Sequence, residues 1–216
     1  PEREAAAFVD AGKGVADVAA ALEGARWILM ENFAEDAELV GVLRRLLWDR
    51  GEWKSTVVRG KEEDGIKFSD YFHASEPVRS LPSHRILALL RGRKEGFLRL
   101  AVVLVDDAAA DGPTLPERHI AARAGIESRG RPADAWLAET VRWTWRMKML
   151  GSLEVDIEVR LREQAEAEAI RVFGRNLHDL LLAPPAGQRV TMGLDPGIRT
   201  GVKVAVVDGT GKLLDT

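Results

Sequence analysis

The sequence predicts a mainly α protein with small β elements, on three observations. Apolar residues recur at helical spacing through most of the stretch from residue 13 to residue 182. Two short runs, 53–59 and 96–105, are rich in residues that favour strands. The last part, 190–216, alternates apolar runs with Pro-Gly and Asp-Gly turns. The predicted order is a helical region with a minor two-stranded sheet, then a long helix, then a β-hairpin.

The composition limits the classes of protein to which the chain can belong. Of its 216 residues, 46% are apolar, which is ample for a core, and 30% are charged, with a net charge of −3. Nucleic-acid binding would therefore require a local basic patch, because the overall charge is unfavourable. The lack of cysteine excludes disulfides and thiolate metal sites. No apolar run reaches the ~20 residues of a membrane helix, so we expect a cytoplasmic protein without a membrane partner.

Both ends of the sequence indicate a fragment. It begins with Pro1, without an initiator methionine or the layout of a signal peptide. A last strand begins at Lys212, directly after a turn, and the sequence stops at Thr216. We therefore expect the chain to be a piece of a longer protein.

Helical spacing predicts three helices in the first 50 residues. The first begins after Lys13, and Gly24 is expected to separate it from a second helix over 25–33. The third covers 35–48, with acidic residues in its first turn and arginines near its end, as the helix dipole favours. Its predicted apolar face consists of Leu39, Leu43, Leu46 and Leu47.

A small sheet is expected after Gly51. The strands 53–59 and 96–105 are predicted to pair, and 60–65 to form an exposed turn. Phe68, Tyr71 and Phe72 are spaced to share one face of a short helix, which Pro77 would end. These aromatic residues are more typical of a core than of a stacking surface.

The most basic segment is predicted to be a helix between an N-cap at Ser83 and a C-terminal glycine at Gly92. Its apolar residues would bury one side. Its candidate nucleic-acid-binding residues have no acidic partner inside the segment; they are His84, Arg85, Arg91, Arg93 and Lys94. Unpaired cations at this density suit phosphates. The structural alternative is that the arginines complement the helix end or pair with distant carboxylates.

The second half is predicted to be strongly helical. A short helix covers 117–124, and a helix that starts near Pro132 has a Trp-rich stripe along one side. That stripe consists of Trp136, Thr140, Trp143, Met147 and Leu150. Gly151-Ser152 is expected to break the helix before a long one over 153–182. The buried side of the long helix is predicted to contain Leu153, Ile157, Leu161, Ile170, Phe173, Leu177 and Leu181.

A Pro- and Gly-containing segment, 184–189, is the predicted linker between a helical region, 1–183, and a truncated domain, 190–216. In the second part, Asp195 ends an apolar strand and is followed by a Pro196-Gly197 turn. We expect Gly197 and Gly201 to let a ligand or backbone come close, because they have no Cβ. Alternatively, Asp195 caps its own turn, which is ordinary chemistry for Asp before Pro-Gly.

The pattern of strand, Asp, Gly-containing turn and strand resembles the opening hairpin of ribonuclease-H-like proteins, and GLDPGIRTG is most similar to their YqgF group. That resemblance makes Asp195 a vestigial or metal-binding candidate and 196–201 its motif turn, comprising Pro196, Gly197, Arg199, Thr200 and Gly201. Active nucleases of the superfamily need further carboxylates from later strands, none of which is present in this sequence.

Five blocks of the chain resemble the bacterial transcription accessory protein family Tex. They are 22–33, 82–96, 130–145, 168–182 and 193–216. The resemblance implies a large, mostly helical protein that binds nucleic acid and is linked to transcription, with the transcription machinery as a further partner. It also implies a helical region before a YqgF-like domain that lacks a complete nuclease site. Helix-hairpin-helix modules and an oligonucleotide-binding-fold RNA domain would follow.

Two functions are therefore weighed. The first is a non-catalytic scaffold that binds RNA or DNA and needs no cofactor. The second is a metal-dependent, resolvase-like nuclease that uses Asp195. A kinase-like or actin-like phosphate site is a weaker third, because DPG followed by RTG fits it poorly. The sequence has no Walker loop, GxGxxG, HExxH or GxSxG motif, and its four histidines lack metal-ligand spacing.

Overall fold

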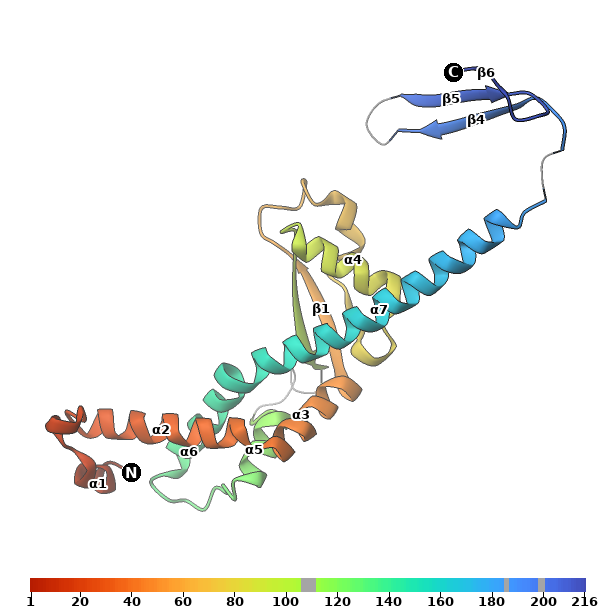
Figure 1. Ribbon diagram of the computed structural model, residues 1–216. Coiled ribbons are helices and arrows are strands. Elements are labelled where there is room, and N and C mark those ends of the chain that lie inside the picture. The colour runs from red at the N-terminus through yellow and green to blue at the C-terminus, as the bar shows by residue number, and fades with distance from the viewer. Residues whose placement is uncertain (106–111, 185–186, 198–200) are drawn as a thin grey trace. The chain divides into compact units, whose positions relative to one another are not determined.

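The computed structural model describes residues 1–105, 112–184, 187–197 and 201–216 (Figure 1). The chain forms two compact units, Pro1–Ala169 and Ile170–Thr216. The boundary falls inside the long helix α7, and the predicted linker 184–189 lies within the second unit. Among the described residues, no helix is long and apolar enough to cross a membrane.

Helices make up most of the first unit. The α-helices are α1 (Glu2–Ala5), α2 (Val18–Glu35), α3 (Ala37–Arg50), α4 (Ser83–Lys94), α5 (Leu115–Arg123), α6 (Asp134–Trp143) and α7 (Leu150–Leu181). Short 3-10 helices are η1 (Ala6–Phe8), η2 (Ala11–Lys13), η3 (Ile66–Tyr71) and η4 (Val78–Ser80). The core between them is built mainly of leucine, isoleucine and valine side chains, with Trp53, Phe68 and Trp145 also buried.

The first long helix is continuous, so the predicted interruption at Gly24 is wrong. Asp17 caps α2 by accepting the N–H of Ala20 at 2.8 Å. Gly24 lies inside the helix on an exposed face, and one glycine in an 18-residue helix costs too little to break it. The next helix is as predicted: Asp36 accepts the N–H groups of Glu38 and Leu39 at 3.0 Å, and α3 follows.

The predicted pairing of the two strands is confirmed. In the sheet β2-β1-β3, β1 (Gly51–Val57) pairs antiparallel with β3 (Leu98–Leu104), and Trp53 faces Val102 on the buried side. The third strand, β2 (Ser75–Pro77), was not predicted. Pro77 is tolerated there because β2 is an edge strand, where a missing N–H breaks no ladder bond on the open side.

Helices α6 and α7 are joined without a break by a π-helical segment, Thr144–Met149 (η6). The predicted break at Gly151 is therefore wrong. The wider π turn also rotates the helix, so that Trp145 and Met149 are buried, whereas Met147 is 59% exposed. Part of the predicted stripe consequently faces solvent. The buried Thr140 and Thr144 bond the carbonyls one turn back, at 2.8 and 2.9 Å.

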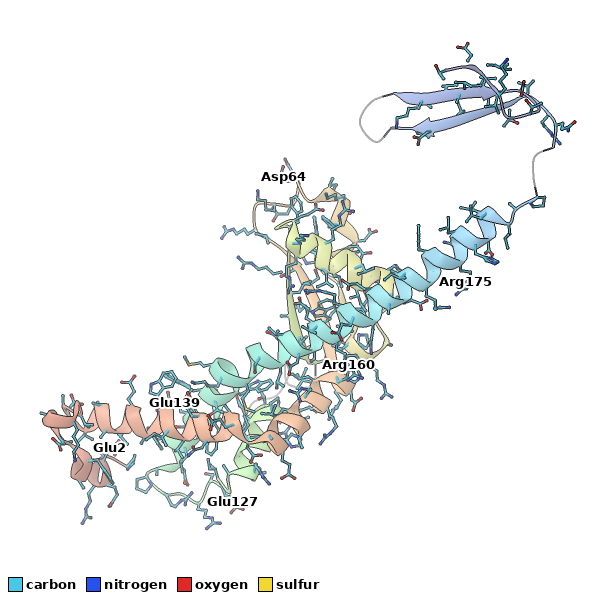
Figure 2. All side chains as sticks on the ribbon, in the orientation of Figure 1. Glu2, Asp64, Glu127, Glu139, Arg160 and Arg175 are labelled. Atoms are coloured by element: carbon cyan, nitrogen blue, oxygen red, sulfur yellow. The ribbon has the colours of Figure 1, made fainter. Side chains whose placement is uncertain are left out.

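Helix α7 is held to α3 by charged side chains. The guanidinium of Arg160, labelled in Figure 2, lies 3.5 Å from the ring centroid of Trp48. Arg44 donates to Asp156 at 2.6 Å. Nearby, Glu154 accepts the N–H of Val102 at 2.8 Å. These contacts fix the first half of α7 against α3 and against strand β3.

The predicted buried side of α7 is correct only in its first half. Leu153, Ile157 and Leu161 are buried, and the core ends at Ala165. Beyond it the apolar residues are exposed, which corrects the prediction for Ile170, Phe173, Leu177 and Leu181. Ala165 is the last residue of the helix in the core of the first unit, and residues from Ile170 onward belong to the second unit.

The second unit contains the predicted hairpin. Strand β4 (Thr191–Pro196) pairs antiparallel with β5 (Val202–Val207), and β6 (Leu213–Asp215) adds to β5. The turn before β6 is stabilised by Asp208, whose Oδ1 accepts the N–H groups of Thr210 and Lys212 at 2.8 and 3.0 Å. The apolar strands and the turn at Asp208 thus form as the sequence predicts.

Candidate nucleic-acid interface

Helix α4 carries all five predicted nucleic-acid-binding residues, but its ends differ from the prediction. The N-cap is Pro82, and Ser83 is already helical. Gly92 lies inside the helix and is buried, because it is the point at which α4 touches β3. The glycine that follows the helix end is Gly96, with a φ of 80°. A left-handed residue at this point is best supplied by glycine.

The close approach at Gly92 positions the basic end of α4. A Cβ on Gly92 would lie 2.5 Å from Cδ1 of Leu98. Because α4 packs directly on β3 at Gly92, the last turn of α4 is fixed beside α7. Arg91, Arg93 and Lys94 then line an open groove of about 950 Å³, and α7 contributes Arg162 and Glu166 to the same groove.

Ion pairs organise this groove. Arg93 binds both carboxylate oxygens of Glu158, and Arg162 donates to the same carboxylate at 2.5 Å. The hydrogen bond to Glu158 raises the pKa of Arg93. Such a two-bond pair fixes the plane of the guanidinium. The alternative that the arginines pair with distant carboxylates therefore applies to Arg93.

A second carboxylate lies at the end of α4. Glu95 pairs with Lys67, and it accepts from Arg91 Nε at 2.7 Å. The hydrogen bond from Lys67, followed by that from Arg91, lowers the pKa of Glu95. Lys94 differs from its neighbours: it is exposed and has no ion-pair partner in the described part of the chain.

The structure does not bring all five predicted residues together. His84 and Arg85 lie in the first turn of α4, about 10 Å along the helix axis from Arg91 and Arg93. Arg85 pairs with Glu76 at 2.6 Å, and its guanidinium lies 5.2 Å from the centroid of the Tyr71 ring. The candidate interface is therefore the groove around Arg91, Arg93 and Lys94, and His84 and Arg85 lie outside it.

Sequence reasoning missed the contribution of α7. Arg162 and Glu158 are one helical turn apart, a spacing that indicates a helix-surface pair. Nothing in the local sequence indicates that this pair faces Arg93, which is 65 residues away in the chain. In the groove the cations Arg91, Arg93, Lys94 and Arg162 outnumber the carboxylates Glu95, Glu158 and Glu166.

The other predicted site is in the second unit. Asp195 lies in β4 opposite Lys203, and its Oδ2 is 3.5 Å from the lysine Nζ. Both side chains are exposed. No group of three or more potential metal ligands occurs within 1–105, 112–184, 187–197 and 201–216.

The motif turn is described only in part. Arg199 and Thr200 lie outside the described residues. Gly197 donates its N–H to the carbonyl of Gly201 at 2.9 Å, directly after Pro196 ends β4. At Gly201 an added Cβ would meet no described atom within 4 Å, so no described backbone approaches it closely. Its φ of 65° is the physical reason for a glycine.

Two family descriptions match the sequence. "Tex central region-like" matches residues 1–173, and "Tex protein YqgF-like domain" matches residues 189–216. The first covers α1 to α6, the sheet of the first unit and α7 as far as residue 173. The second covers the hairpin that contains Asp195.

Similar proteins occur in bacteria and animals. The chain is 56% identical to Protein YhgF of Escherichia coli (strain K12), over 100% of this chain and 28% of that protein. It is 54% identical to Transcriptional accessory protein Tex of Neisseria gonorrhoeae, over 99% of this chain and 28% of that protein. It is 28% identical to S1 RNA-binding domain-containing protein 1 of Homo sapiens, over 89% of this chain and 20% of that protein.

The chain thus spans 28% of the length of these bacterial relatives. The match over residues 1–173 includes α4, the sheet on which it seats and the first part of α7. On this evidence, the chain belongs to the Tex family.

Proposed function

We propose that this chain is a non-catalytic, nucleic-acid-binding scaffold of a transcription accessory protein. The observation that carries the proposal is the groove between α4 and α7, in which cations outnumber carboxylates and Lys94 has no ion-pair partner among the described residues. Phosphates attract such a surplus of positive charge without regard to base sequence.

The names of relatives support the same function. One bacterial relative is called a transcriptional accessory protein, and a human relative is named for an RNA-binding domain. We further propose that the protein acts in the cytoplasm with RNA or DNA as its partner, and with the transcription machinery as a second partner. Because the net charge is −3, binding by this chain alone is expected to be weak and sensitive to salt.

The proposal is tested by gel-shift titrations with single-stranded RNA, single-stranded DNA and duplex DNA. The sharpest variant is Lys94→Glu, because it changes the groove without breaking an ion pair. Replacing Arg93 would instead leave the carboxylate of Glu158 with fewer partners. The matched control is Lys54→Glu, at an exposed lysine of β1 that lines no part of the groove.

We expect Lys94→Glu to weaken binding to every nucleic acid that the wild type binds, and Lys54→Glu to leave it unchanged. Equal binding by Lys94→Glu and the wild type would remove the groove from the interface. The non-catalytic part is tested separately, by incubating labelled RNA, DNA and branched DNA with the protein and Mg²⁺. Cleavage that Asp195→Asn abolishes would establish the nuclease alternative.

A further inference from the structure

Two arginines from different helices share one carboxylate beside the groove between α4 and α7. Arg93, in the last turn of α4, bonds both carboxylate oxygens of Glu158 through Nη1 and Nη2. Arg162, one turn further along α7 than Glu158, donates from Nη2 to Oε1 of the same carboxylate at 2.5 Å. Since the Nη2 nitrogens of both arginines bond the same oxygen, the two guanidiniums lie next to each other.

The two guanidiniums face the groove, and the carboxylate supports them from behind. The side chain of Glu158 is 16% exposed, compared with 39% for Arg93 and 44% for Arg162. Both arginines are lining residues of the groove, and Glu158 is not. A guanidinium has more N–H donors than these bonds use, so each arginine keeps donors for a ligand in the groove.

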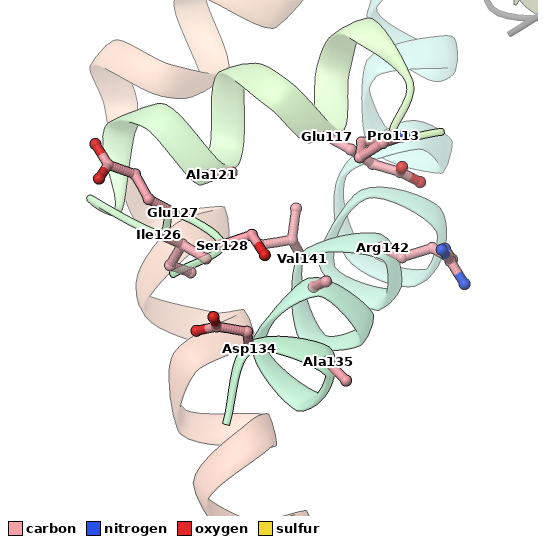
Figure 3. Close-up of a pocket in the computed structure, with 11 residues that line it drawn as sticks. Pro113, Glu117, Ala121, Ile126, Glu127, Ser128, Asp134, Ala135, Val141 and Arg142 are labelled. Atoms are coloured by element: carbon pink, nitrogen blue, oxygen red, sulfur yellow. The ribbon is translucent and has the colours of Figure 1, made fainter. Parts of the chain in front are cut away.

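The arginine–carboxylate pairs at the cavity between α5 and α6 lack this arrangement. Figure 3 shows Glu127 and Asp134, which line that cavity of about 380 Å³. Each pairs with an arginine of the neighbouring loop: Arg129 Nη2 lies 2.8 Å from Glu127, and Arg131 Nη2 lies 2.8 Å from Asp134. Those pairs stabilise one loop. Glu158 instead joins an arginine of its own helix to one that is 65 residues away in the chain.

We propose that Arg93 and Arg162 together bind one phosphate of the nucleic acid, and that Glu158 is the positioning residue that holds them for it. Two neighbouring guanidiniums repel each other, and the carboxylate between them offsets that repulsion. Its two bonds to Arg93 also fix the plane of that guanidinium, so less side-chain freedom is lost when a phosphate binds. This assignment rests on the proposed nucleic-acid-binding function.

The charge of Glu158 and its positioning role predict opposite changes in affinity. Glu158→Ala removes a negative charge beside the groove, which on charge alone would strengthen binding. The same variant releases both arginines, whose side chains must then be ordered when a phosphate binds. We expect the second effect to be larger, because two long side chains are released, and binding to weaken about threefold or more. Glu158→Gln keeps one oxygen for the two Nη2 donors, so it should bind more tightly than Glu158→Ala.

Binding of the 216-residue chain is measured by fluorescence anisotropy with a labelled single-stranded RNA, and again with a labelled DNA duplex. The matched control is Asp156→Ala, which removes a carboxylate from the same helix and breaks its bond to Arg44 of α3 at 2.6 Å. Asp156 lines no part of the groove, so this variant should bind at least as tightly as the wild type. Binding by Glu158→Ala that equals or exceeds that of the wild type would overturn the positioning role. An equal loss in Asp156→Ala would overturn it too, because the packing of α7 would then explain both results.

Arg93→Gln, Arg162→Gln and the double variant test whether one phosphate is shared. We expect the double variant to bind about as weakly as either single variant, because Glu158 neutralises whichever arginine remains. Losses that multiply would overturn the shared site. Lys94→Glu separates this proposal from the function on which it rests. If Lys94→Glu weakens binding and Glu158→Ala does not, only the shared-phosphate assignment fails, whereas a wild type that binds neither nucleic acid would overturn both.

Discussion

Replacing Gly92 with alanine tests the contact that positions the basic end of α4. The added Cβ would lie 2.5 and 2.9 Å from Cδ1 and Cγ of Leu98, and 3.2 Å from Cδ1 of Phe68. Leu98 is 2% exposed, so its side chain has no open space into which to move. Overpacking of this kind costs about 1–3 kcal/mol, and the better helix propensity of alanine offsets about 1 kcal/mol. Because the closest contact is only 2.5 Å, we take the upper part of that range, about 2–3 kcal/mol, and therefore expect a net loss of about 1–2 kcal/mol.

The matched control is Gly24→Ala in α2. Its added Cβ would meet nothing within 4 Å. The same chemical change should therefore stabilise the protein, by about 0.5–1 kcal/mol. Two glycines inside helices thus have opposite predicted signs, and only the close approach to β3 distinguishes them.

The assay is urea unfolding followed by tryptophan fluorescence, which reports on the first unit because all six tryptophans lie in it. For a slope of about 2 kcal/mol per M urea, Gly92→Ala should lower the midpoint by about 0.5–1 M, and Gly24→Ala should raise it slightly. A midpoint for Gly92→Ala at or above that of the wild type would refute the packing of α4 on β3.

Two carboxylates give further predictions, each followed by chemical unfolding across pH. The hydrogen bond from Arg123, and then that from the N–H of Leu39, lower the pKa of Asp36 below its ordinary 3.8. The stability that the ionised Asp36 contributes is therefore fully present above pH 3.8 and is lost as the pH falls through the lowered pKa. Asp36→Ala should be destabilised most at neutral pH. Asp36→Asn should be destabilised less, because asparagine can still cap the helix. Equal destabilisation of the two variants would contradict the assignment of Asp36 as the cap of α3. Burial raises the pKa of Glu154 above its ordinary 4.5, so stability is lost as pH rises from 4.5 through the raised pKa. Glu154→Gln keeps an acceptor for the N–H of Val102 and should be more stable than the wild type at neutral pH. The difference in stability should shrink below pH 4.5. A difference independent of pH would count against the raised pKa of Glu154.

Local patterns were sufficient for most of the elements. Helical spacing, with acidic residues in the first turn, predicted α3, and turn chemistry at residues 208–211 predicted the turn before β6. These features depend on residues within one or two turns of each other. The same reasoning could not find β2, because three residues without alternation become a strand only when β1 is beside them.

The remaining differences have tertiary causes. The π-helical segment after Trp143 shifts the buried face, and helical spacing assumes a regular α-helix throughout. Gly92 appeared to be a helix end because its packing partner, Leu98, lies in another element. In the candidate site, the cations of α4 were predicted by composition. Their shared partner Glu158 was not, since the fold alone brings α7 to the groove.

The salt dependence of RNA binding tests the central claim most directly. Fluorescence anisotropy with a labelled single-stranded RNA would give the observed binding constant at several salt concentrations for the wild type, Lys94→Ala and the control Lys54→Ala. If Lys94 contacts a phosphate, the slope of log Kobs against log salt should be less steep by about 0.7 in Lys94→Ala and unchanged in Lys54→Ala. A wild-type slope in Lys94→Ala would contradict the assignment of the groove between α4 and α7 as the nucleic-acid interface.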